Sequence, residues 1–125
     1  MVQNKFNKIY AYVNMKKFTL IDFQTNETTE FNSNTAREAA LKAATRNETM
    51  IVLLEADKLH IFEGVKRLLK EEEMNEFTKN KNINSKPVVR KLGYQKLDRT
   101  VDLKKEGDIK YLKHVFSEYT QIYQD

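Results

Sequence analysis

The stretch "NTAREAALKAATRN" (residues 34–47) decides the fold, because it predicts one short helix between segments that alternate like strands. Thr35, with Glu38 three residues later, matches a capping box, which satisfies the free amides at a helix start. Five alanines, with Leu41 beside them, allow this helix to approach a sheet closely. Asn47 is the expected stop. The basic residues expected off the packed face are Arg37, Lys42 and Arg46.

Strand patterns lie on both sides of this helix. Apolar and polar residues alternate with a period of two, and polar turns separate the segments. The expected strands are residues 6–13, 16–23, 28–32, 50–55, 59–64 and 87–97. Between the last two strands we expect a short helix over 65–73 and an irregular polar segment over 75–86. Apolar residues at helical spacing predict an amphipathic helix over 109–123.

This order predicts an α+β fold: a small strand-strand-helix-strand-strand-strand pseudo-barrel of antiparallel strands with one central helix, plus a C-terminal amphipathic helix. A chain of 125 residues has the size of one domain. We expect an N-terminal extension with a strand (1–15), a main domain (16–98) and a C-terminal extension (99–125). Docking of helix 109–123 on its own domain is the favoured interpretation. Self-association or binding of a protein partner through this helix is the alternative.

Composition excludes several kinds of site. The chain has no cysteine, which removes disulfides, zinc–thiolate sites and thiol nucleophiles. The two histidines, His60 and His114, have no ligand or triad spacing, and the three glycines are isolated. The start lacks the long apolar region of a signal peptide, and no apolar run approaches bilayer length. We therefore expect an intracellular, soluble protein that is no enzyme, with no cofactor, metal, small-molecule substrate or membrane partner.

The net charge of +4 becomes informative once it is localised. The segment "FTKNKNINSKPVVRKLGYQK" (77–96) carries six basic residues and no acidic one. Such segments bind nucleic acid because each neutralised phosphate releases condensed counterions. An apolar side chain such as Phe77 is able to wedge between base steps. The opposing interpretation is a charged edge strand protected against aggregation. The glutamates of "KEEEMNE" (70–76) would have to point away from DNA.

Three motifs in order resemble a known family. They are "R-x-AALKAA-x-R" at residues 37–46, "H-[IV]-F" at 60–62 and "SKP-x-V-[KR]-K" at 85–91. Together they cover about residues 16–98. In order and spacing they resemble methanogen chromosomal protein 1, a family of small monomeric archaeal nucleoid proteins with relatives in some large DNA viruses.

The resemblance implies that residues 16–98 form a domain that binds double-stranded DNA without strong sequence preference and bends it. It implies that the central helix braces the sheet while a long arm before the last strand grips DNA. Relatives carry a tryptophan in the arm. This chain has none, Lys79 falls at that place, and Phe77 is the nearest aromatic residue. From the resemblance and the basic segment together, the expected DNA-binding residues are Lys16, Arg37, Lys58, Phe77, Lys79, Lys81, Lys86, Pro87, Arg90 and Lys91.

The leading hypothesis is therefore an architectural, non-sequence-specific DNA-binding protein of the chromosome or of a packaged genome. Its location would be the nucleoid, or the virion if the source is viral. The first alternative is an interaction module that kept the fold, weakened its DNA binding and recruits a partner through helix 109–123. An RNA-associated role is the second, because a basic arm alone does not separate duplex types.

Overall fold

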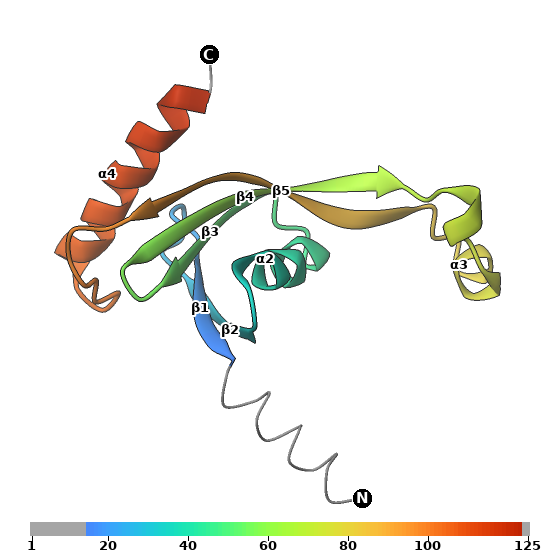
Figure 1. The fold of residues 1–125 in the computed structure, drawn as a ribbon, viewed down its shortest axis with the longest axis horizontal. Helices are drawn as coiled ribbons and strands as arrows, with labels where there is room; N and C mark the ends of the chain where they lie inside the picture. The colour runs from blue at the N-terminus through green and yellow to red at the C-terminus, as the bar shows by residue number, and fades with distance from the viewer. Residues whose placement is uncertain (1–14, 124–125) are drawn as a thin grey trace, which may run out of the picture.

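One antiparallel sheet of five strands organises the molecule (Figure 1). The computed structural model describes residues 15–123, with side chains placed as far as Glu118. The strand predicted at 6–13 lies outside the described residues. The order across the sheet is β2-β1-β3-β4-β5. The strands are β1 (Lys16–Ile21), β2 (Thr28–Ser33), β3 (Met50–Glu55), β4 (Lys58–Leu68) and β5 (Ser85–Lys96). The predicted α+β fold is confirmed.

Helix α2 (Ala36–Thr45) covers one face of this sheet. The Thr35 hydroxyl accepts a hydrogen bond from the Glu38 amide at 3.2 Å, as the capping pattern predicts. Four of its alanines are buried against an apolar cluster contributed by the strands. Leu41 differs from expectation: it is 41% exposed, because it lies on the outer side of the helix. Asn47 follows the helix with a positive φ of 69°, which ends the helix.

Helix α4 (Glu106–Tyr123) packs on the other face of the sheet (Figure 1). Leu112 is fully buried there, and Val115 is nearly so. Their neighbours are apolar residues from four of the strands and the segment after β5, and include Ile21, Val52, Leu59, Ile61 and Leu97. The helix is thus part of the core, as the favoured interpretation predicts. Within the described part of the chain, no helix is long and apolar enough to span a bilayer.

Strands β4 and β5 continue beyond the sheet as an arm, which we define as residues 65–88 (Figure 1). Strand β4 pairs with β3 only as far as Glu63, and from there it pairs with β5 alone. Gly64 lies at this point of departure. Its amide donates to the Thr49 carbonyl at 2.8 Å, and a Cβ added to it would lie 2.3 Å from the Glu48 carbonyl oxygen. Glycine is needed here for close packing.

The helix predicted over 65–73 is wrong. Residues 65–68 belong to β4, and a single 3-10 turn, η1 (Glu71–Glu73), follows. Residues 65–68 form a strand and not a helix because each of them pairs with a residue of β5. The helical spacing of apolar residues in "VKRLL" does not reveal this long-range pairing. The segment expected to be irregular contains a short helix, α3 (Glu76–Asn80), at the far end of the arm (Figure 1). The Asn75 side chain caps this helix by accepting from the Thr78 amide at 2.9 Å.

Candidate nucleic-acid interface

The β4–β5 hairpin presents two sides, one toward α2 and one toward α4. Side chains alternate between them along each strand. On β5, Val89 packs in the cluster under α2, whereas Leu92 packs against the cluster under α4. Each basic residue of the hairpin is assigned to a side through the partner it faces in the register. We call the two surfaces the α2 side and the α4 side.

The α2 side carries a row of basic residues along β5. Arg37, in the first turn of α2, donates from Nη2 to the Val89 carbonyl at 3.3 Å, which fixes its guanidinium beside this strand. Lys91 faces Phe62 of the α2-side cluster, and Lys58 faces Lys96 at the opposite end of the hairpin from the arm. We define the basic stripe as Arg37, Lys58, Lys66, Lys91 and Lys96.

A β-bulge between Ile61 and Phe62 shapes this stripe. Because it shifts the register by one residue, Lys91 and Tyr94 share a side although they are three positions apart. The Lys91 ammonium lies 5.9 Å from the centre of the Tyr94 ring, and this ring is 44% exposed. The bulge therefore places a cation and an exposed aromatic ring together beside α2.

The two sides differ in how their cations are neutralised. Within the described residues, no cation of the basic stripe lies within 4.0 Å of a carboxylate oxygen. On the α4 side, Arg90 forms an ion pair with Glu63, which faces it on β4. Lys86 pairs with Glu73 at 2.6 Å, and Arg67 with the same carboxylate at 2.9 Å. Free positive charge therefore gathers on the α2 side.

His60 lies within the stripe, between Lys58 and Lys91. The centre of its ring lies 5.3 Å from that of Tyr94, with the two planes tilted by 49°, and 5.9 Å from that of Phe18. Its Nε2 shares a hydrogen bond of 3.0 Å with Glu55. Burial lowers the pKa of His60, and although Glu55 opposes this shift, the net direction is downward. Glu55 also lies 3.8 Å from Lys16, on β1. Lys16 is thus separated from the hairpin by β3 and is engaged with a carboxylate.

The arm ends in exposed side chains. Phe77, in α3, is 64% exposed, and the neighbouring Lys79 and Lys81 are exposed as well. Leu68, at the end of β4, is 73% exposed. Apolar side chains so open to water at the tip of a projecting hairpin contribute little to the fold. They are available to contact a ligand.

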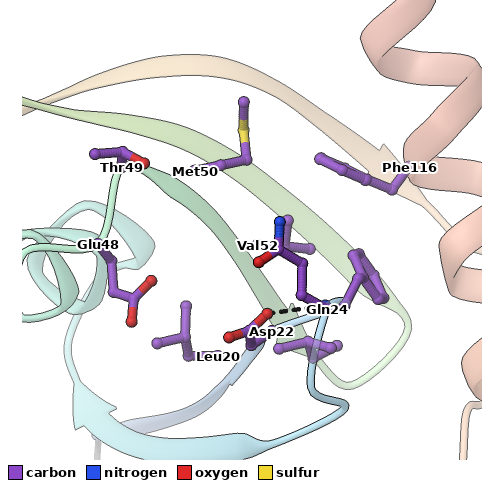
Figure 2. Close-up of a pocket in the computed structure, with 10 residues that line it drawn as sticks. Leu20, Asp22, Gln24, Glu48, Thr49, Met50, Val52 and Phe116 are labelled. Atoms are coloured by element: carbon purple, nitrogen blue, oxygen red, sulfur yellow. Dashed lines mark hydrogen bonds between the residues drawn. The ribbon is translucent and has the colours of Figure 1, made fainter.

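A hollow of about 240 Å³ lies elsewhere, between the β1–β2 turn, the segment after α2 and α4 (Figure 2). Asp22 and Glu48 border it together with Met50 and Phe116. Two carboxylates with no neighbouring cation in its lining would repel phosphate, so this hollow is no candidate for nucleic acid. Among the residues described, no group of three or more His, Cys, Asp or Glu side chains is placed to hold a metal ion.

The structure separates the residues expected at the site. Arg37, Lys58, Pro87 and Lys91 lie on the α2 side, Lys86 and Arg90 on the α4 side, and Phe77, Lys79 and Lys81 at the arm tip. Sequence reasoning missed Lys66, Arg67 and Lys70 because it assigned them to a helix. Lys66 and Arg67 lie on β4, where they pair with Pro87 and Lys86 of β5, and Lys70 directly precedes η1; no local pattern in the sequence shows this pairing.

Comparison with known proteins agrees with this architecture. The family model described as "Non-histone chromosomal protein MC1" matches residues 14–98. Chromosomal protein MC1b of Methanothrix soehngenii is 40% identical over 86 residues, which cover 67% of this chain and 98% of that relative. No solved structure matches the chain significantly. Because the match spans the whole sheet, α2 and the arm, this chain belongs to the Non-histone chromosomal protein MC1 family.

Proposed function

We propose that this protein is a chromosomal DNA-binding protein that grips double-stranded DNA through the basic stripe and the arm. Family membership supports the chromosomal role. The observation that carries the proposal is the asymmetry of charge on the hairpin: cations on the α2 side lack carboxylate partners among the described residues, and those on the α4 side have them. A phosphate that binds on the α2 side therefore does not have to displace a carboxylate of the protein.

The dimensions of the stripe suit a duplex. Lys66, at the end of the stripe nearest the arm, faces Pro87 on β5. From Pro87 to Lys96 a strand advances about 3.3 Å per residue, so the stripe is roughly 30 Å long. One turn of B-DNA is about 34 Å long, so the stripe spans most of a turn along the axis of the duplex. Lysine and arginine contacts to phosphate carry no sequence information, which favours binding without sequence preference. Association with the nucleoid, or with a packaged genome in a virus, follows from such binding.

Bending is the finer part of the proposal, and Phe77 supports it. An apolar wedge between base steps kinks a duplex. Phe77 is exposed in α3, and α3 lies at the far end of an arm that projects beyond the sheet (Figure 1). The packing of α4 weakens the alternative that this protein is an interaction module. Leu112 and Val115 are buried in the core and so do not form an exposed docking surface.

The test compares two charge-matched double variants. Arg37→Gln/Lys91→Gln removes two cations of the stripe, and Lys42→Gln/Lys113→Gln removes two exposed cations elsewhere. Lys42 is a close control, since it also donates to a strand carbonyl, that of Asn32 on the opposite edge strand β2. Titration of a labelled duplex of about 20 base pairs at several salt concentrations should show at least about tenfold weaker binding for the first variant. Its salt slope should be smaller by about 2.

The control variant should bind nearly as the wild type does. Equal losses in both double variants would mean that net charge, not the stripe, drives binding. Absence of wild-type binding at low salt would overturn the DNA proposal. Replacing the duplex with double-stranded RNA tests the RNA alternative directly.

For bending, Phe77→Ala should lower energy transfer between labelled duplex ends more than Met50→Ala does. Met50 is an exposed apolar residue of the hollow.

A further inference from the structure

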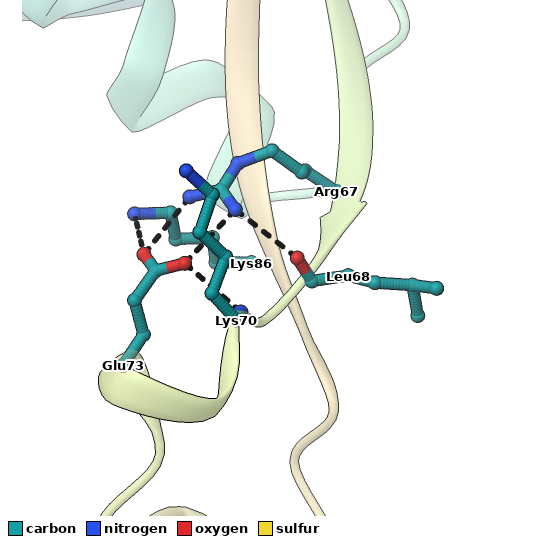
Figure 3. Close-up of polar contacts among 5 residues, drawn as sticks. All are labelled: Arg67, Leu68, Lys70, Glu73 and Lys86. Carbon is teal, nitrogen blue, oxygen red and sulfur yellow. Dashed lines mark hydrogen bonds and ion pairs between the residues drawn. The ribbon is translucent and has the colours of Figure 1, made fainter.

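In η1, just beyond the paired strands of the arm, the carboxylate of Glu73 accepts hydrogen bonds from three residues (Figure 3). Glu73 accepts from both terminal nitrogens of Arg67, at 2.9 Å each, with one bond to each carboxylate oxygen. The Lys86 ammonium lies 2.6 Å from Oε2. The backbone amide of Lys70 donates to Oε1 at 3.0 Å. These donors come from β4, from β5 and from the residue before η1.

This donor set is of the kind that proteins use for phosphate. The guanidinium fork holds carboxylate and phosphate in the same two-bond geometry, and a lysine and a backbone amide complete a typical anion site. The position is open to a ligand: the side chains of Arg67 and Lys86 are 36% and 43% exposed. The Glu73 carboxylate therefore occupies a place where a phosphate group would find four donors.

Glu73 is firmly ionised in this position. The hydrogen bonds from Arg67, then from Lys86, then from the Lys70 amide hold its pKa well below the usual range. The cluster consequently carries two positive charges and one negative charge at any physiological pH. An incoming phosphate has to compete with a bound anion, which is not the case on the α2 side.

We propose that Arg67, Lys86 and the Lys70 amide form a second phosphate-binding site, on the α4 side of the arm, with Glu73 as its built-in competing anion. Displacement of Glu73 by a DNA phosphate fills the site when the duplex wraps around the arm. Until then, Glu73 reduces the contribution of these cations to affinity. The inference deepens the proposed function and rests on it for the identity of the phosphate source.

The decisive variant is Glu73→Gln, which keeps the size of the side chain and one acceptor oxygen but removes the competing charge. The matched control is Glu72→Gln, its neighbour in the same turn, which removes the same charge from an exposed side chain outside this cluster. We expect Glu73→Gln to bind the duplex about tenfold tighter at low salt than Glu72→Gln does. Its salt slope should be steeper by 1 to 2, about one unit for each cation that gains a phosphate.

Arg67→Gln in the Glu73→Gln background should lower the slope again by about one unit, because one of the two cations is then missing. Equal affinities for Glu73→Gln and Glu72→Gln would overturn the proposal, because only net charge would then matter. Weaker binding by Glu73→Gln would also overturn it and make Glu73 a positioning residue that braces the arm. Thermal unfolding followed by circular dichroism shows whether each variant is folded.

A second measurement separates this inference from the DNA proposal. Inorganic phosphate is titrated into Glu73→Gln and Glu72→Gln, and the Lys70 amide is followed by nuclear magnetic resonance. A saturable shift confined to Glu73→Gln supports the anion site even if no variant binds a duplex. In that case the DNA proposal alone fails. No shift of this amide in Glu73→Gln would overturn the site.

Discussion

His60 is the residue at which the protein's stability should respond to pH. Its side chain is only 12% exposed, and burial lowers its pKa below the ordinary value of 6.5 despite the bond to Glu55. The positive charges of Lys91 and Lys58 act in the same direction. Because the unfolded chain takes up the proton at higher pH than the folded protein does, protonation favours unfolding. We expect the free energy of unfolding to be highest above about pH 6.5 and to fall as the pH is lowered toward 5.

Urea unfolding at a series of pH values checks this expectation. His60→Gln should flatten the decline, whereas His114→Gln should keep it, since His114 is exposed on α4. An unchanged pH profile in His60→Gln would show that another group is responsible.

The basic stripe could not be located as exactly from the sequence, because simple alternation puts Lys91 and Tyr94 on opposite sides. The bulge at Ile61/Phe62 reverses that assignment. Gly93, which faces Ile61 at the bulge, is its only nearby signal in the sequence, and an isolated glycine does not fix the register.

Among the elements, the arm shows what sequence patterns can and cannot predict. The central helix was predictable because its cap, its alanines and its stop are all local signals. The outer part of β4 was not, since its strand structure depends on β5, which lies about 20 residues further along. The exposed Val65 and Leu68 fit helical spacing as well as they fit a strand. Only cross-strand pairs such as Val65 with Val88 decide between the two.

Gly64 determines where the arm leaves the sheet, and this gives a prediction for the element. Gly64→Ala should lower the free energy of unfolding by about 1–3 kcal/mol, because the added methyl meets the Glu48 carbonyl and a backbone must shift. Gly107→Ala is the control. Its Cβ meets nothing within 4 Å, and alanine favours helix α4, so stability should stay constant or rise by up to about 1 kcal/mol. Chemical denaturation measures both. Similar effects in the two variants would argue against close packing at Gly64.

On the scale of the whole molecule, the sheet separates two tasks. One face carries α2 and, beside it, the basic stripe, and the other carries α4 and an apolar cluster. The family match ends at residue 98, yet α4 beyond it completes the second cluster. Helix α4 is therefore part of the core although it lies outside the residues that the family model matches. Stability and DNA binding should respond to different substitutions.

Leu112→Ala tests this separation. Leu112 is fully buried against the sheet, so truncation should lower the free energy of unfolding by about 2–5 kcal/mol. Lys113→Ala, one residue along on the exposed side, should change it by less than about 0.5 kcal/mol. At a temperature where both variants are folded, the dissociation constant for duplex DNA should match the wild type, because α4 lies across the sheet from the stripe. If Leu112→Ala left stability intact but a partner or a self-association was lost, α4 would be an interaction helix and its packing on the sheet dispensable. Weakened DNA binding by the folded variant would instead mean that the two faces are coupled through the strands they share.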